Sequence, residues 1–388
     1  MSISKKIFII SSVLLATVLF FMAIYNISFK KDKIPEASNN KTEETKNTGI
    51  AEKIGEKLSV SKREKIYQLA NEAVISPVID KSGEKIIYYN KLNGNVYQVS
   101  FDGENKVLVD DNNFIGLENV RWNFDKNKVI SRFNSNGKIQ YSAYDYELKK
   151  GYKLSEGIEY VAWNNLGDQI IYKYSDSKNG KRTINIANFD GSNWNKITDS
   201  ASNSSWIAPV PQSSFVSYWN MPNAFEETAL NIVSTVGGSV RKIFSGRFGA
   251  DYLWSPNGTK SLVSSSDVKG GSKISLALIN SNGGEYQNFN IPTFVSKCVW
   301  SKDDKTVYYA LPSISSEGYV LPNDYMNKKV ISKDTFWKLD IATGKTERVV
   351  DIGEIKDSYD ATNLFLSPSE DALFFVNRTD GKLYGLSL

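Results

Sequence analysis

The 388-residue sequence contains no histidine and a single cysteine, Cys298. Without histidine, the chain cannot use a Ser-His or Cys-His catalytic pair, a histidine zinc ligand or an imidazole acid or base. One cysteine allows neither an internal disulfide nor a cysteine metal cluster, and a free cysteine is typically a small buried residue. The sequence also lacks the glycine-rich phosphate loops, the G-x-S-x-G elbow and the H-E-x-x-H motif. We therefore expect no catalytic, metal-binding or cofactor-binding residues.

An excess of positive charge is found only near the N-terminus. Residues 1–65 contain twelve Lys or Arg and seven Asp or Glu, whereas the remainder contains 35 and 36. A nearly neutral body lacks the concentrated basic surface that nucleic acids require. We therefore expect no nucleic-acid partner.

Residues 7–29 form a run of 23 residues without a charge, with lysines on both sides. As a helix this run would be about 34 Å long, enough to cross a hydrocarbon core of about 30 Å. The alternative is a cleaved signal peptide, whose apolar region is usually about 7 to 15 residues long and ends in small residues. This run is longer and ends in Tyr25, Asn26 and Phe29. We predict an uncleaved single-pass anchor in the cell membrane, with a short tail (residues 1–6) inside and the body outside the cytoplasm.

Residues 30–63 are polar, carry charges of both signs and are poor in aromatic side chains. Such a composition cannot bury enough apolar surface to offset the entropy of ordering. We predict a flexible linker here, followed by one folded body over residues 64–388.

The body repeats one pattern, seen most clearly in "DYLWSPNGTKSLVSS" at 251–265. A short strand ends near a Trp, a polar turn follows, and a second strand rich in Ile, Val, Tyr and Phe comes next. Related units begin near residues 73, 120, 161, 205, 252, 298 and 364. A period in the mid-forties made only of strands and turns is typical of the blades of a β-propeller.

Each unit continues with an alternating third strand, a tight turn and a more polar fourth strand, except the seventh, which lacks the fourth. The segment 64–72 precedes the first unit and can supply the missing strand, which would leave no unpaired sheet edge where the ring closes. A helix is the alternative for this segment on propensity. We predict an all-β fold with a seven-bladed propeller, with six or eight blades as alternatives.

The W-S-P-x-G units resemble the TolB-type and WD-type propeller repeats over residues 64–388. The resemblance implies the fold and little about function. The chain departs from TolB in lacking a preceding α/β domain, and from true WD repeats in lacking the Gly-His and Trp-Asp pairs. The partners of those families are therefore not carried over.

The repeated tryptophans look at first like a binding set, but one per blade near the axis is what wedging between neighbouring sheets requires. We interpret them as core residues. They are Trp122, Trp163, Trp206, Trp254 and Trp300.

Two insertions follow second strands, at 219–227 and 311–333, and should lie on the same face of the ring. Long loops in compact domains are often functional, and these carry aromatic residues of the kind that interfaces use. If they bind a partner, a protein or peptide is favoured, because no Lys or Arg cluster accompanies them; the alternative is that they merely cap the channel. The candidate partner-binding residues are Trp219, Phe225, Tyr319 and Tyr325.

We interpret the protein as a membrane-anchored, non-catalytic propeller that binds or scaffolds a protein or peptide. The alternative is a carbohydrate-active propeller that cleaves or binds a glycan, because glycosidases can work with carboxylates alone. Two Asp or Glu side chains about 5 to 10 Å apart in the central channel would favour the alternative.

Overall fold

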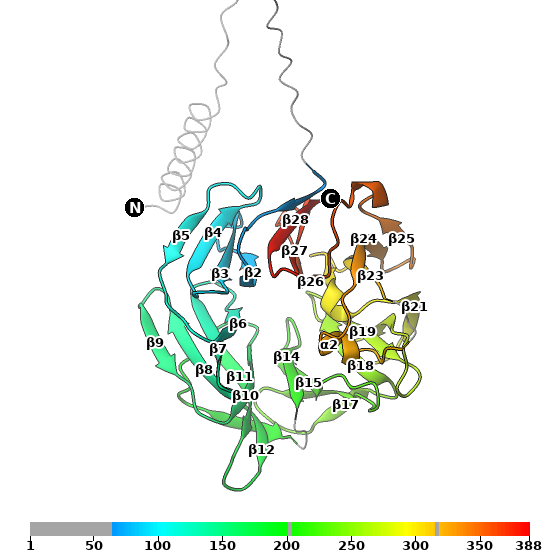
Figure 1. The fold of residues 1–388 in the computed structure, drawn as a ribbon. Coiled ribbons are helices and arrows are strands. Elements are labelled where there is room, and N and C mark those ends of the chain that lie inside the picture. Colours follow the sequence, from blue (N-terminus) through cyan, green and yellow to red (C-terminus); the bar gives the residue numbers. More distant parts are fainter. Residues whose placement is uncertain (1–63, 201–203, 315–317) are drawn as a thin grey trace, which may run out of the picture. The chain divides into compact units, whose positions relative to one another are not determined.

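The computed structural model describes residues 64–200, 204–314 and 318–388, which form seven four-stranded antiparallel sheets arranged as a ring (Figure 1). The predicted all-β, seven-bladed propeller is confirmed. Within this part of the chain, no helix is long and apolar enough to span a membrane. The predicted anchor at 7–29 and linker at 30–63 lie outside the described residues.

The strands of each blade are numbered first to fourth from the central axis outward, and strands with the same number lie in equivalent places. The innermost strands are β2 (Val74–Ile79), β6 (Leu117–Trp122), β10 (Ile158–Trp163), β14 (Ser205–Pro209), β18 (Phe248–Trp254), β22 (Cys298–Trp300) and β26 (Ala361–Leu366). The second strands are β3 (Lys85–Asn90), β7 (Lys128–Ser135), β11 (Gln169–Ser175), β15 (Phe215–Asn220), β19 (Lys260–Ser266), β23 (Thr306–Ser313) and β27 (Ala372–Asn377).

The outer half of each blade is built in the same way. The third strands are β4 (Val96–Ser100), β8 (Lys138–Asp145), β12 (Arg182–Asn188), β16 (Leu230–Ser234), β20 (Ser275–Asn280), β24 (Lys333–Asp340) and β28 (Leu383–Ser387). The fourth strands are β5 (Val107–Asp110), β9 (Lys150–Lys153), β13 (Asn195–Asp199), β17 (Arg241–Phe244), β21 (Gln287–Ile291), β25 (Thr346–Arg348) and, in blade 7, β1 (Ile66–Gln68). The short helices are η1 (Val295–Lys297), α2 (Asn323–Met326) and η2 (Ile352–Glu354).

The ring closes through β1, which pairs antiparallel with β28, with Ile66 opposite Leu386. The fourth strand of blade 7 therefore comes from the N-terminal side of the body, within the segment 64–72. This pairing gives blade 7 the fourth strand that each of the other six blades has from its own contiguous chain.

The residue that follows the repeated Trp explains why the turn motif recurs. The Asn123 Oδ1 atom accepts a hydrogen bond from the Lys128 backbone N–H at 3.0 Å, and the Ser301 Oγ atom accepts one from the Thr306 N–H at 2.9 Å. A short polar side chain thus closes the hairpin between the first two strands. The same turn contains a residue with positive φ, such as Gly258 at 70°, where glycine carries no steric cost.

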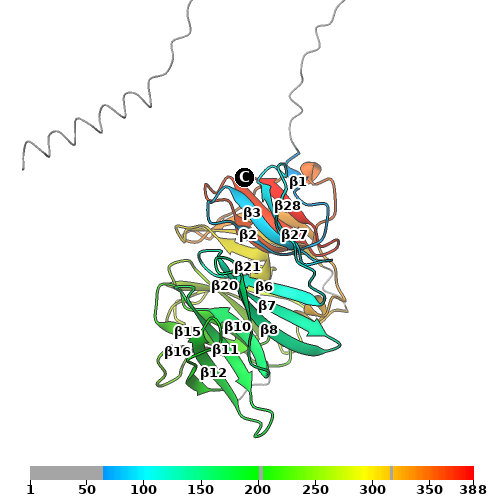
Figure 2. The ribbon, with the colours of Figure 1, turned by 90° about the vertical axis from the view of Figure 1, so that its left-hand side faces the viewer.

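Four of the five repeated tryptophans join neighbouring blades, which confirms their interpretation as core residues. The Trp163 Nε1–H group donates to the Arg121 carbonyl of the preceding blade at 2.8 Å, and Trp300 donates to the Leu253 carbonyl at 3.3 Å. Trp122 and Trp254 make equivalent bonds to Ser76 and Ser217. Figure 2 shows blades 2 and 3 as adjacent layers.

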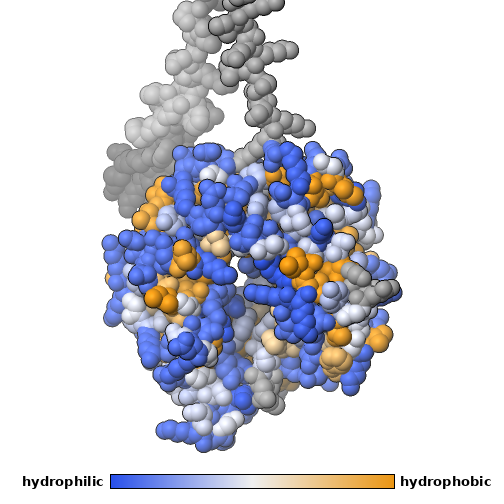
Figure 3. All heavy atoms as spheres, viewed as in Figure 1, coloured by the Kyte–Doolittle hydropathy of each residue, from blue (hydrophilic) through white to orange (hydrophobic). Residues whose placement is uncertain are grey.

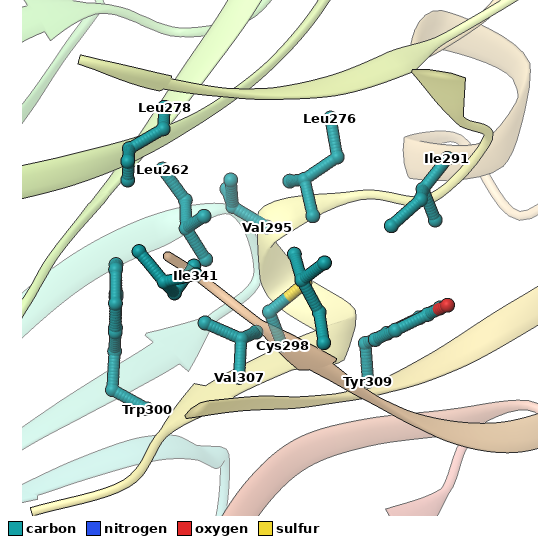
Figure 4. Close-up of a cluster of buried hydrophobic side chains, with 11 residues drawn as sticks. Leu262, Leu276, Leu278, Ile291, Val295, Cys298, Trp300, Val307, Tyr309 and Ile341 are labelled. Carbon is teal, nitrogen blue, oxygen red and sulfur yellow. The ribbon is translucent and has the colours of Figure 1, made fainter. Parts of the chain in front are cut away.

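The core lies between the sheets, and Cys298 belongs to it. In the cluster between blades 5 and 6, Cys298 packs with Leu262, Val307 and Trp300 (Figure 4). Burial raises the pKa of the Cys298 thiol well above its ordinary value, so the reactive thiolate is disfavoured. Each fully buried Leu or Val side chain stabilises the fold by about 1.5–3 kcal/mol.

Candidate functional site

The centre of the ring contains a cavity of about 630 Å³, within the usual size range of ligand sites. Its walls are innermost-strand residues of blades 1 to 5, together with η1, and Figure 3 shows the ring hollowed at this place. The cavity is lined by aromatic rings, amides, Arg121 and Asp251. This combination of apolar surface with a few polar groups is typical of a binding site.

A second chamber of about 490 Å³ adjoins the first, between blades 2, 3 and 4. The two chambers share three lining residues, Arg121, Tyr160 and Trp206. These three residues therefore stand at the junction, where a ligand that extended through both chambers would pass.

Arg121 is the distinctive charge of this junction. Its guanidinium carbon lies 4.6 Å from the centre of the Tyr160 ring, a cation–π arrangement that holds the side chain flat against the ring. Within the described part of the chain, Arg121 forms no ion pair with a carboxylate. The fork of N–H donors on arginine matches a carboxylate or phosphate, so this residue is suited to an anionic ligand.

The other charges of the second chamber are paired. Arg132 forms an ion pair with Glu118, and the buried Lys173 ammonium lies 2.8 Å from Glu159 Oε2. Both lysine and arginine are thus fixed by acidic partners. Because Arg121 adds a further positive charge, cations outnumber anions around the chamber.

Asp251 is the single acidic residue that lines the first cavity. One of its oxygens, Oδ1, accepts hydrogen bonds from Trp219 Nε1–H at 3.0 Å and from the Tyr252 N–H at 2.9 Å. Burial raises the pKa of Asp251 to about 7, and these two bonds only partly oppose the rise. A carboxyl that titrates near neutrality is suited to accept or release a proton.

Trp206 departs from the other four tryptophans of the repeat. It is only half-buried, it lines both chambers, and its ring stands edge-on to that of Trp219 at 6.3 Å. Flat aromatic faces of this kind offer a packing surface for the apolar face of a ligand ring. Trp206 packs against the core cluster of blades 4 and 5 but is only half-buried and also borders the channel, so its interpretation as a core residue holds only in part.

The four predicted partner-binding residues divide into two pairs. Trp219 and Tyr325 are each only 5% exposed, whereas Phe225 and Tyr319 are 51% and 37% exposed. The Trp219 indole is hydrogen-bonded to Asp251, and the Tyr325 hydroxyl is hydrogen-bonded to Asp360 in the interior of blades 6 and 7. Neither side chain therefore offers a surface to a protein partner. A binding role for Phe225 and Tyr319 stays a prediction.

The two long loops lie on the same face of the ring and touch. The Ala224 N–H donates to Asn323 Oδ1 at 2.7 Å, and Asn323 Nδ2 donates to Asn223 Oδ1 at 3.0 Å. The loop of blade 5 lies between them, where the Gly270 N–H donates to the Ala224 carbonyl at 2.7 Å. Loops of blades 4, 5 and 6 thus form one connected cover.

A buried charge network fastens this cover to blades 6 and 7. The Lys297 ammonium donates to Asp334 at 2.6 Å and to Asp360 at 2.8 Å, and all three side chains are fully buried. Tyr325, in α2, donates to Asp360 at 2.7 Å, and Arg378 donates to the Tyr325 carbonyl at 2.8 Å. The charges of Lys297, Arg378 and the two aspartates balance, so the network holds the structure together without an open position.

The pair of carboxylates that would have favoured a glycan-cleaving enzyme is absent from the linings of the two chambers as far as the structure describes them. Asp251 is the one acid around the first chamber, and Glu159 is the one acid around the second. Sequence reasoning missed Arg121 and Asp251 because neither belongs to a motif and each occupies an ordinary strand position.

No protein-family model matches the sequence, and no curated protein is similar to it. Solved structures share the fold. An oligogalacturonate lyase in complex with manganese is 12% identical with a TM-score of 0.60, over 83% of this chain and 93% of its own. An oligogalacturonate lyase from Vibrio parahaemolyticus is 12% identical with a TM-score of 0.59, over 84% and 94%. TolB from Acinetobacter baumannii is 12% identical with a TM-score of 0.45, over 71% and 62%.

At these identities the likeness establishes the propeller fold alone, and at that level the predicted resemblance to TolB-type propellers is confirmed by the seven four-stranded sheets. The comparison contradicts our expectation of a non-catalytic protein- or peptide-binding module and of a chain that is not an enzyme. The structures with TM-scores of 0.60 and 0.59 are enzymes named for an oligosaccharide. The carbohydrate-active alternative is the one that the comparison favours.

Proposed function

We propose that this propeller is a carbohydrate-active enzyme that takes an acidic oligosaccharide into its central channel and cleaves it by elimination. The observation that carries the proposal is Arg121, a cation without a carboxylate partner among the described residues, at the junction of the two chambers. The similarity to oligogalacturonate lyases supports an acidic sugar chain as the substrate class.

The residues around the junction match such a ligand. Arg121 would bind a uronate carboxylate through two parallel N–H donors, an arrangement stronger than neutral hydrogen bonds. Tyr160 and Trp206 would pack against the sugar rings on either side. The two chambers, of about 630 and 490 Å³, together offer room for more than one sugar unit.

Elimination suits a channel with one available acid. A base removes the proton from the carbon next to the carboxylate, a carbon–carbon double bond forms, and the glycosidic carbon–oxygen bond breaks as the oxygen takes up a proton. Asp251, with its pKa raised by burial to about 7, would serve as the base above that pH. Hydrolysis by the retaining or inverting route uses two carboxylates, and the first cavity is lined by Asp251 alone.

The side chains do not fit the manganese ion that one of the similar enzymes contains. The chain has no histidine, and its described part contains no group of three or more His, Cys, Asp or Glu residues that could hold a metal. In our proposal the Arg121 cation offsets the charge of the substrate carboxylate, and this makes the neighbouring proton easier to remove.

The test is incubation of the full-length chain with oligogalacturonate, measured in two ways. Elimination produces a conjugated double bond, seen as ultraviolet absorbance, together with new reducing ends, whereas hydrolysis produces reducing ends alone. We expect absorbance to rise with the wild-type chain and to be lost in Arg121→Ala and Asp251→Asn. A neutral glucan is the control substrate. Failure to cleave or bind oligogalacturonate would contradict the proposal.

We also propose that residues 7–29 anchor the protein in the cell membrane with the propeller outside the cytoplasm. The support is the uncharged run of 23 residues, long enough to cross a bilayer. Protease added to intact cells should release a soluble fragment that starts within residues 30–63. Complete protection of the propeller would contradict this placement.

A further inference from the structure

A third cavity, of about 430 Å³, lies between blades 1 and 2 and shares no lining residue with either chamber of the channel. Its walls come from β3, β7, β8 and β9 and from the connection that follows β5. Six aromatic rings line it: Tyr89, Phe114, Phe133, Tyr144, Tyr146 and Tyr152, the last with the Lys150 ammonium 4.9 Å from its centre. We call it the inter-blade pocket.

The rings of the inter-blade pocket are held in fixed positions. The hydroxyl groups of Tyr89 and Tyr146 are hydrogen-bonded to each other, and Trp122 stacks on Tyr146 with ring centres 5.6 Å apart. Tyr144 meets Tyr146 edge to face at 4.9 Å. Phe114 makes the same kind of contact with Phe133. Because these contacts exist without a ligand, binding would require little further ordering of the side chains and would have a small entropic cost.

Two polar side chains of the pocket have unused bonding capacity. Asp110 lines it, and its carboxylate has neither an ion pair nor a hydrogen bond from a side chain in the described part of the chain. The Asp110 charge, after burial, contributes to a raised pKa of Tyr144, so the carboxylate lies near the rings. The Nδ2 group of Asn112 is buried without a hydrogen-bond partner among the described residues. Buried polar groups left in this state usually meet a water or a ligand.

Gly151 opens the wall of the pocket. It lies within β9 and pairs with Tyr144, and a Cβ atom built there would only touch Tyr144 at 3.7 Å. The backbone does not have a positive φ at this residue, so glycine is not needed for conformation. A glycine in a strand interior often marks a place where another molecule approaches, and here it leaves the pocket accessible.

We infer that the inter-blade pocket binds a small organic cation, an ammonium group joined to an apolar or aromatic body. Tyrosine rings attract a cation over their faces, and the effect grows when water is excluded. Asp110 supplies the counter-charge, and the apolar walls accept the body of the ligand. Lys153 also lines the pocket; its ammonium group lies 3.6 Å from Glu156, a carboxylate that it shares with Lys138 at 3.1 Å.

The test is calorimetric titration of the full-length chain with three probes of similar shape: benzyltrimethylammonium, the neutral neopentylbenzene and the anionic phenylacetate. We expect the cation to bind at least tenfold more tightly than either of the others. Asp110→Asn should weaken its binding at least tenfold. Arg121→Ala, in the channel, should leave it unchanged, which separates this site from the proposed activity.

Gly151 supplies a matched pair of variants. Gly151→Leu should abolish binding by filling the pocket, whereas Gly151→Ala should weaken it less than about threefold, because its Cβ makes only an ordinary contact. Thermal unfolding checks that both variants fold. If Gly151→Leu does not fold, the binding measured for Asp110→Asn tests the inference instead. Equal binding of the neutral probe, tighter binding of phenylacetate, or no binding of the cation would each overturn the inference.

Discussion

The two sides of the ring differ in whether key charged side chains have a partner of opposite charge. Where the loop cover of blades 4, 5 and 6 is fastened to blades 6 and 7, Lys297 and its two aspartates are fully buried and every charge has a partner. Across the channel, in blades 2 to 5, Arg121 has no carboxylate partner among the described residues, and Asp251 is half-buried and forms no ion pair there. Taking a charge out of water is costly unless it is paired. The paired side therefore serves stability, and the unpaired side is the one available for binding and chemistry.

Removing a cation from the paired side should have the largest effect. Lys297→Met leaves Asp334 and Asp360 buried next to each other without their shared cation. We expect the free energy of unfolding to fall by about 3–5 kcal/mol, measured by urea denaturation. The control is Lys305→Met, which breaks an exposed pair with Asp303 and should cost less than about 1 kcal/mol. Equal effects of the two variants would show that burial of the network is unimportant.

Trp163 of blade 3 and Trp206 of blade 4 test whether a residue serves stability or binding. Trp163→Ala removes a buried ring and its bond to the neighbouring blade, so we expect a loss of about 3–5 kcal/mol in thermal or urea unfolding. Trp206→Ala removes a half-buried ring at the channel and should cost about 1–2 kcal/mol. Oligogalacturonate binding should be lost in Trp206→Ala. A Trp206→Ala variant that is destabilised as much as Trp163→Ala would place Trp206 back in the core.

On the unpaired side, Arg121→Ala should affect binding rather than stability. Hydrogen bonds to charged groups contribute about 1.5–3 kcal/mol, which corresponds to a loss of affinity of about tenfold to a hundredfold. Calorimetry with oligogalacturonate measures this loss. The matched control is Arg132→Ala, whose guanidinium is already paired with Glu118 and which should weaken binding about threefold or less. A stronger effect of Arg132→Ala would move the anionic site away from the junction.

The last prediction concerns the pH dependence of stability. The pKa of Asp251, about 7 in the native state, lies above its ordinary value of 3.8, so between these values the native state keeps a proton that the unfolded chain has lost. The contribution of Asp251 to stability is therefore full below pH 3.8 and is lost as the pH rises to about 7, by about 1.4 kcal/mol for each pH unit. Asp251→Asn should remove this slope, as urea unfolding at several pH values can show.

The control for the pH dependence is Asp199→Asn, because the side chain of Asp199 is exposed. This variant should leave the slope of stability against pH unchanged. Parallel curves for the wild type and Asp251→Asn would mean that Asp251 titrates at its ordinary pKa and is a poor candidate for the base.

The repeat predicted the architecture because the turn that defines each blade is formed by residues close together in the sequence. A Ser or Asn after the Trp closes a hairpin within five residues, as Asn123 and Ser301 do, so the sequence displays every blade separately. The site is not local in this sense. Arg121, Tyr160 and Trp206 come from three blades, and only ring closure brings them to one junction.

The inaccurate predictions concern three aromatic residues whose surroundings the local sequence does not show. Trp206 looks in the sequence like the other four tryptophans, but in blade 4 their place is taken by Pro209, which pairs with Val216 as Trp254 pairs with Ser261. Trp206 lies three residues earlier on β14 and is only half-buried. Tyr325 stands in an insertion and Trp219 near the end of β15, at the start of the segment predicted as an insertion, where aromatic residues suggest a surface. Their burial depends on Asp251 and on Asp360, residues 32 and 35 positions away on other blades.

The pairing of β1 with β28 has a consequence for the order in which the protein can be made. A ribosome delivers Ile66 early and its partner Leu386 some 320 residues later, so the first strand of the body waits through most of synthesis with its bonding edge unused. Blades 1 to 6 can form as they emerge, since each is built from contiguous chain. Blade 7 cannot form before translation of the whole body, and until then the nascent protein lacks the contact that closes the ring and is open to pairing with other chains.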